Sequence, residues 1–291
     1  MQSDSTGVSF FSKTPTVCPV CEVKFYREEM RTGRGRLIAG ALTRELRRTY
    51  EPSKKFGEVY PLIYTVLVCP SCYYAAYPQD FSGISDSAAN AVRNAAQLRI
   101  DNIAQIADGL DFTRPRGLKE GLAAYTLAVM CYDHFPDESG PTIKQGLSCL
   151  RAAWVCNDLH GKEPGENYDK LARVLYRKAR FFYALAVEQE QTGVQGIPSG
   201  FPLGPDLDKN YGYDGILYMA GLLDWLYGPR KNSERRRSGL ERSKRTVAKI
   251  FGMGRASKEK PAAILDNARS LYEEIAHELG LKNTDPERDD G

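Results

Sequence analysis

The chain has 291 residues, 42% hydrophobic and 26% charged, a composition that excludes a disordered chain and predicts two modest domains. Lys and Arg number 40 against 37 Asp and Glu, a balance too even for a protein that binds nucleic acid over its whole surface. No apolar run reaches the roughly 18 residues of a membrane helix, and residues 1–19 lack the pattern of a secretory signal. We therefore expect a cytoplasmic protein with no membrane span.

The first 84 residues predict a tail followed by a small β domain. Residues 1–15 are polar and are expected to form a disordered tail. Residues 16–84 contain two β-type runs, 23–26 and 59–68. In the second run Leu62, Tyr64, Val66 and Val68 alternate with period two, which predicts a strand covered on both sides.

Residues 85–280 predict a helical domain. Apolar side chains recur at three- and four-residue spacing, and the expected helices are 86–106, 118–134, 143–159, 168–191, 214–226 and 261–279. Two segments interrupt them. Residues 193–215 are rich in Gly and Pro and exceed the usual helix connection, and residues 229–260 carry twelve Lys or Arg against three Glu. An acidic tail, 281–291, follows.

Two C-P-x-C knuckles are the strongest chemical signal in the chain. Cys18-Pro-Val-Cys21 and Cys69-Pro-Ser-Cys72 each present two thiols from one tight turn. Four thiolates form the closed, tetrahedral environment of structural zinc, and about 10 to 16 kcal/mol of metal binding would decide whether so small a domain folds. We therefore predict one structural Zn²⁺ held by these four cysteines.

The cysteines also allow other interpretations. A thioredoxin-type redox pair usually occurs once and opens a helix, which neither knuckle does. Cys131, Cys149 and Cys156 lie within helical stripes and are interpreted as core residues. Zinc release on thiol oxidation remains a third hypothesis for the role of the site.

These features resemble a bacterial family catalogued as domain of unknown function 2225, over residues 16–280. The resemblance rests on the first knuckle with Phe25, on residues 64–77 with Asp80-Phe81, and on the helical segments 121–125, 150–154 and 218–222. It implies a zinc-knuckle domain joined to tetratricopeptide-like helices and carries no reaction. The chain departs from the family at the residue after each knuckle, where Glu22 and Tyr73 replace the common glycine. A left-handed backbone there would cost roughly 1 to 2 kcal/mol.

The predicted fold class is α+β, mostly α: a zinc-ribbon domain (16–84) followed by a tetratricopeptide-like antiparallel helical array (85–280). The 34-residue repeat is only partly matched, by Tyr218, Gly221 and Leu222 and by Ala248 and Phe251 further on. An irregular helical bundle remains the alternative.

Two arginine-rich sets are candidate nucleic-acid-binding residues, although solvated surface explains them as well. One lies between the knuckles (Arg31, Arg34, Arg36, Arg44, Arg47, Arg48) and the other in the basic insertion (Arg235, Arg236, Arg237). The three histidines are isolated, and no catalytic motif is present, so we expect no enzyme. The leading hypothesis is an adaptor that binds a protein or peptide partner through a helical-repeat groove. A nucleic-acid-associated protein is the alternative.

Overall fold

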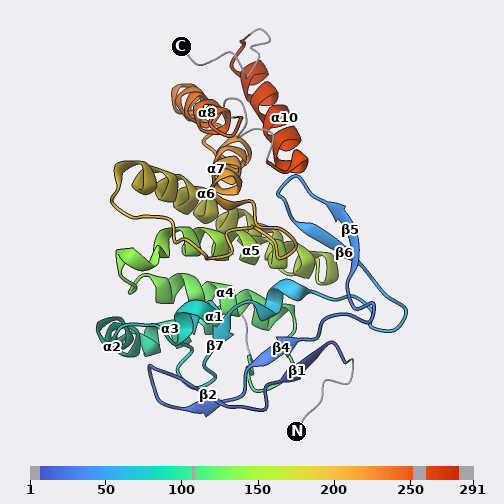
Figure 1. The fold of residues 1–291 in the computed structure, drawn as a ribbon, viewed down its shortest axis with the longest axis vertical. Coiled ribbons are helices and arrows are strands. Elements are labelled where there is room, and N and C mark those ends of the chain that lie inside the picture. The colour runs from blue at the N-terminus through green and yellow to red at the C-terminus, as the bar shows by residue number, and fades with distance from the viewer. Residues whose placement is uncertain (1–6, 107–108, 252–259, 282–291) are drawn as a thin grey trace.

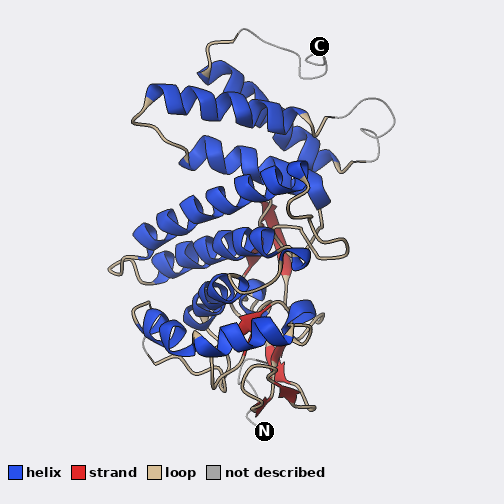
Figure 2. Ribbon diagram, turned by 90° about the vertical axis from the view of Figure 1, so that its left-hand side faces the viewer, coloured by secondary structure: helices blue, strands red, loops and turns tan. Residues whose placement is uncertain are grey.

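The computed structural model describes residues 7–106, 109–251 and 260–281. Short strands occupy the N-terminal part of the chain, and helices stacked one after another make up most of the rest (Figures 1 and 2). This is the mostly helical architecture with a small β part that the sequence predicts. Among the described residues, no helix combines the length and the apolar composition needed to cross a membrane.

Within the described residues, the strands pair as short antiparallel ribbons. Ribbons of this size are marginally stable in water, so they depend on what they pack against or bind. The pairs are β1 (Ser9–Phe11) with β4 (Glu28–Met30), β2 (Thr16–Val17) with β3 (Lys24–Phe25), β5 (Ile38–Leu42) with β6 (Arg48–Glu51), and β7 (Leu67–Val68) with β8 (Ala75–Ala76).

The predicted disordered tail, 1–15, is wrong for the residues of β1. Phe10 pairs with Glu29 in the ladder, and the hydroxyl of Ser9 donates to the buried carboxylate of Glu28. That carboxylate comes from a strand almost twenty residues away, and local polarity alone does not reveal it. Residues 1–6 of the predicted tail and residues 282–291 of the predicted acidic tail lie outside the described residues.

The segment 59–68, predicted as one strand, contains a short 3₁₀ helix, η1 (Pro61–Tyr64), and only its last two residues form strand β7. Pro61 starts η1 because its fixed φ suits the first helical turn and it has no N–H to donate to a ladder. Leu62 and Ile63 are both buried, which period-two alternation does not account for.

The helical segment predicted over 86–106 is two helices, α2 (Asp86–Asn94) and α3 (Ala96–Ala104), after the one-turn α1 (Pro78–Phe81). The Ser85 hydroxyl caps α2 by accepting from Ala88 N. The chain turns at Ala95, where the buried guanidinium of Arg99 donates to the carbonyl of Val92.

The remaining helices form an antiparallel array in which each packs against the next along the chain. Neighbouring helices turn buried apolar faces toward one another, as in helical-repeat proteins. They are α4 (Leu118–Tyr132), α5 (Pro141–Lys162), α6 (Tyr168–Thr192), α7 (Gly212–Tyr227), α8 (Ser233–Ala248) and α10 (Ala262–Glu278), with a 3₁₀ turn η2 (Asp137–Ser139) before α5.

The basic segment 229–260 is not a solvated insertion, because α8 lies within it and packs against α7 and α10. Leu240 and Val247 are buried in this contact. Gly221 of α7 permits the close approach, since a Cβ there would lie 2.4 Å from a methyl group of Val247. Residues 252–259 lie outside the described residues.

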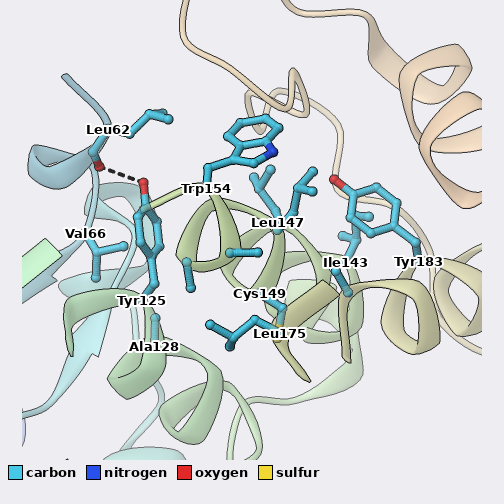
Figure 3. Packing of buried hydrophobic residues seen from close by; sticks show 14 of the residues in the cluster. Leu62, Val66, Tyr125, Ala128, Ile143, Leu147, Cys149, Trp154, Leu175 and Tyr183 are labelled. Carbon is cyan, nitrogen blue, oxygen red and sulfur yellow. Dashed lines mark hydrogen bonds between the residues drawn. The ribbon is translucent and has the colours of Figure 1, made fainter. Parts of the chain in front are cut away.

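One continuous apolar cluster runs from Cys18 in the first knuckle to Leu279 after α10. The boundary predicted at 84/85 therefore does not divide the molecule into two cores. Figure 3 shows part of the junction, where the hydroxyl of Tyr125 in α4 donates to Leu62 O of η1 at 2.6 Å. The Gly/Pro-rich connection 193–215 contributes Phe201 and Leu203 to the cluster.

Candidate metal centre

The two knuckles have the same backbone hydrogen bonds. In the first, Glu22 N donates to Cys18 O at 2.8 Å and Cys18 N to Val23 O at 3.0 Å. In the second, Tyr73 N donates to Cys69 O at 3.0 Å and Cys69 N to Tyr74 O at 2.8 Å. Each turn therefore orients its two thiols in the same way. The strand pairs β2–β3 and β7–β8 extend from these turns.

The four sulfurs converge, as the spacing predicts. The Sγ atoms of Cys18 and Cys72 lie 3.7 Å apart, those of Cys21 and Cys69 lie 3.5 Å apart, and all four lie within 4.8 Å of one another. A tetrahedral site with Zn–S bonds of about 2.3 Å places its sulfurs about 3.8 Å apart. The cluster thus has the size and donor set to hold a metal ion.

The sulfurs perturb one another's ionisation. The hydrogen bond with Cys18 lowers the pKa of the Cys69 thiol, whereas hydrogen bonds within the cluster raise the pKa of Cys18, through Cys69, and of Cys72, through Cys18. Burial opposes ionisation of all three. Four adjacent thiolates therefore need a cation to balance their charge, and its binding releases protons.

Two arginines that we did not predict hold the knuckles from the helical side. Arg93 of α2 donates from Nε to Val20 O at 2.6 Å, and Arg99 of α3 donates to Cys72 O at 3.0 Å. Arg99 is 1% exposed. The sequence signal that could have identified Arg99 is its place on the apolar stripe of the predicted helix 86–106. A charged side chain on a buried face needs a partner. Its guanidinium also brings positive charge to the cluster.

The residue after each knuckle has a left-handed backbone, with φ of +65° at Glu22 and +55° at Tyr73. Both are positions at which the resemblance described above implies a glycine. The hydrogen bonds of the turns hold these residues there despite the steric cost of a Cβ.

We expect the Glu22→Gly variant to be more stable than the native chain by about 0.5 to 1 kcal/mol, because glycine removes a left-handed penalty of roughly 1 to 2 kcal/mol and adds a smaller loss of chain entropy. Lys24→Gly, in strand β3, is the control and should be destabilising. Thermal unfolding of the metal-loaded proteins measures both. A Glu22→Gly variant no more stable than Lys24→Gly would contradict the strain.

Cys131, Cys149 and Cys156 are fully buried and lie apart from the four-cysteine cluster. Burial is the largest cause that raises the thiol pKa of each, to about 11 for Cys131 and about 12 for the other two. They are therefore protonated core residues at neutral pH, as the helical stripes predict.

The arginines between the knuckles divide into two groups. Arg31 and Arg34 are exposed, whereas Arg36 is buried and donates from Nε to Gly7 O at 2.9 Å. Arg44, Arg47 and Arg48 instead pair with carboxylates of the C-terminal half. Their partners are Glu274 in α10, Asp158 in α5 and Asp208 in the connection, respectively.

Among the three arginines of the basic segment that were predicted to bind nucleic acid, only Arg236 is buried. It binds Glu278 of α10 through Nε and a terminal nitrogen, both at 2.8 Å. Arg237 pairs with Glu241 one turn along α8, and Arg235 is exposed. The two predicted arginine sets therefore meet at α10, where Glu274 and Glu278 receive one arginine from each.

The turn between β5 and β6, residues 43–47, lies against the helical array (Figure 1). We call it the hairpin tip. Leu46 at its centre is 0% exposed and left-handed, with φ of +59°. The Glu45 carboxylate accepts hydrogen bonds from Trp154 Nε1 in α5 and, at 2.9 Å, from Tyr176 OH in α6. Burial raises the pKa of Glu45, and the hydrogen bonds from Trp154 and Tyr176 partly offset this rise.

The arginines of the hairpin tip extend the same contact. Arg47 binds Asp158 at 2.5 Å, and the guanidinium of Arg44 lies 4.7 Å from the ring centre of Trp225 in α7. Tyr218 OH of α7 donates to Arg44 O at 2.8 Å. The hairpin tip, only five residues long, thus contacts four helices: α5, α6, α7 and α10.

Fold and site together define a helical-array protein whose N-terminal ribbons carry a four-cysteine cluster able to hold a metal ion. The chain belongs to the family described as "Uncharacterized protein conserved in bacteria (DUF2225)", whose model matches residues 11–275. It is 42% identical over 273 residues to an uncharacterized protein of Borreliella burgdorferi, covering 94% of this chain and 98% of that one. No solved structure matches it. The resemblance noted from the knuckles is confirmed.

Proposed function

We propose that this protein is a non-catalytic, zinc-stabilised adaptor that binds a protein or peptide partner through the inner surface of its helical array. The observation that carries the proposal is the docking of the hairpin tip. The array offers paired donors for a carboxylate, carboxylates for flanking cations, and an apolar site that buries a leucine. Such a set recognises a peptide turn.

Zinc is the metal that the site suits best. Four soft sulfur donors favour zinc over hard cations such as calcium and magnesium. A fourth thiolate also occupies the position that catalytic zinc leaves open to water. The ion would therefore hold the two knuckles together and leave partner binding to the helices.

The hairpin tip acts in this proposal as an internal ligand, which a partner replaces or imitates. It carries the sequence Arg44-Glu45-Leu46-Arg47, in which a buried leucine and acid are flanked by cations. A partner would present a turn of the same chemistry. Trp154 is central to this surface because its indole N–H binds the acid and its ring lies under Arg47.

What supports an adaptor over a nucleic-acid-binding protein is the use of the predicted arginines within the fold. Arg44, Arg47, Arg48 and Arg236 bind carboxylates of other elements, so their charge is already compensated. Titration with single-stranded and duplex oligonucleotides at two salt concentrations tests the alternative, since phosphate binding must weaken as salt rises.

A peptide-binding experiment tests the adaptor surface. Leu46→Asp puts an unpaired charge into the apolar site and should release the hairpin tip. A cyclised peptide with the sequence of residues 38–51 should then bind this variant at least about tenfold more tightly than it binds the native chain, a difference of about 1.4 kcal/mol. Isothermal titration calorimetry measures both affinities.

Ile38→Asp is the matched control, because Ile38 lies in the same ribbon and is 40% exposed. It should behave as the native chain. Metal content and circular dichroism show whether each variant is folded. The double variant Glu45→Ala with Arg47→Ala should release the hairpin tip with less disturbance of the apolar site. Equal peptide affinity for the released and native proteins, or none for either, would refute a peptide-binding surface.

A further inference from the structure

A cavity of about 1030 Å³ lies beside the first knuckle, away from the hairpin tip. It is formed by the N-terminal ribbons, by Pro70 of the second knuckle and by the segment before α4. Its size is at the upper end of the range of about 300 to 1,000 Å³ typical of small-molecule sites. The lining residues are Phe10–Lys13, Val23–Tyr26, Arg31, Pro70, Phe112 and Thr113.

Aromatic side chains are the largest group in the wall. Phe10, Phe11, Phe25, Tyr26 and Phe112 all line the cavity. Phe25 and Phe112 are held in the core, where Phe25 packs edge-on against Phe81 and Phe112 against Tyr73. Packing therefore fixes this part of the wall. Tyr26 is 54% exposed at the edge, which leaves apolar surface in contact with water.

The charged groups of the cavity all have one sign. Lys13, Lys24 and Arg31 line it, and no Asp or Glu does. Within the described parts of the chain, none of the three forms an ion pair. Arg31 donates from Nε to Ser9 O and its guanidinium lies 4.9 Å from the ring centre of Phe10. These contacts position the charge over the aromatic wall without neutralising it.

We propose that this cavity binds an amphipathic anion: a carboxylate or phosphate monoester head on a single apolar chain. The aromatic wall takes the chain, because its burial removes apolar surface from water. Lys13, Lys24 and Arg31 take the head group through charge-assisted hydrogen bonds. The site is independent of the adaptor surface and requires nothing from the hairpin tip.

Four ten-carbon probes that differ only in the head group test the proposal. They are decanoate, decyl phosphate, decanol and decyltrimethylammonium, each used below its micelle concentration with the metal-loaded full chain. Calorimetric titration should find both anions binding at least about tenfold more tightly than decanol, and the cation should bind more weakly still. The relative affinity of the two anions assigns the head group. Equal affinity for all four probes, or binding of none, would overturn the proposal.

Substitutions separate the two halves of the site. Lys13→Glu with Lys24→Glu should weaken decanoate at least about tenfold while decanol is unchanged, and Tyr26→Asp should weaken both. The controls are Lys54→Glu with Lys249→Glu and, for the aromatic position, Phe181→Asp, all exposed and outside the cavity. An unchanged affinity of the Lys13/Lys24 variant for decanoate would show that the cations do not bind the head group.

Discussion

We expect the Cys69→Ser variant to lose its metal and to unfold from the N-terminal ribbons. Cys69 is fully buried, and its sulfur lies 3.5 Å from that of Cys21. A serine hydroxyl is a much poorer zinc ligand than a thiolate, and metal binding of this type is worth about 10 to 16 kcal/mol in small zinc modules. Strands of only two residues extend from each knuckle, and they cannot replace that free energy.

The loss of structure in Cys69→Ser should extend beyond the knuckles. The cysteines belong to the same apolar cluster as the helices, so the ends of α2, α3 and α4 lose their cover when the knuckles separate. Elemental analysis should find about one metal ion per native chain and almost none in the variant. The thermal midpoint should fall by about 10 °C or more, as a loss of several kcal/mol implies for a domain of this size.

Cys156→Ser is the matched control for Cys69→Ser. Cys156 is also fully buried but lies in α5, outside the cluster. It should keep its metal and lose only about 1 to 3 kcal/mol, the cost of burying a hydroxyl. A Cys69→Ser protein that retains the native metal content would refute the four-cysteine site, whatever its stability.

The second large effect is expected at Arg116, which precedes α4. Its side chain and that of Glu28 are 3% and 1% exposed, and Glu28 Oε2 lies 3.9 Å from Arg116 Nε. The guanidinium also donates to Val66 O at 2.7 Å and to Ile63 O at 3.3 Å. One arginine thus joins β4, η1 and the start of α4.

Arg116→Met should lower the free energy of unfolding by about 3 to 5 kcal/mol, because it leaves the buried Glu28 carboxyl without the cation that pairs with it. Urea unfolding followed by circular dichroism measures the change. Arg114→Met is the matched control, since Arg114 is 73% exposed and pairs with Asp111 at the surface. Its loss should stay below about 1 kcal/mol. Equal losses for the two variants would contradict a structural role for the buried pair.

The candidate metal site could be predicted from the sequence because the geometry of each knuckle depends only on neighbouring residues. Two cysteines two residues apart, with a proline between them, specify a turn that presents both thiols in one direction. The family resemblance raised a left-handed backbone after each knuckle only as a condition, and the structure shows it at both Glu22 and Tyr73. The apolar stripes of α4 to α7 were predictable for a similar reason, since contacts three and four residues apart fall on one helix face.

The strand prediction for residues 59–68 was wrong because the alternation describes only the hydrophobic pattern and ignores the proline. Pro61 has no N–H to donate to a ladder and its φ suits a first helical turn, and η1 packs against both α4 and β4. The prediction that residues 229–260 form a solvated insertion was wrong for a different reason. Arg236 looks like one cation in a charged run, yet Glu278, more than forty residues away, makes it a buried contact.

Sequence alone determined what depends on short-range geometry: the turns that orient the four thiols and the helical periods of α4 to α7. Tertiary structure alone decided the partners of the charged residues. Glu45 meets Trp154 across more than a hundred residues, and Arg44 meets Glu274 across more than two hundred. An arginine or glutamate can be buried only where a partner offsets its desolvation, and its own sequence neighbourhood does not show whether a distant partner will be there. That choice is made only when distant helices and the hairpin tip pack together.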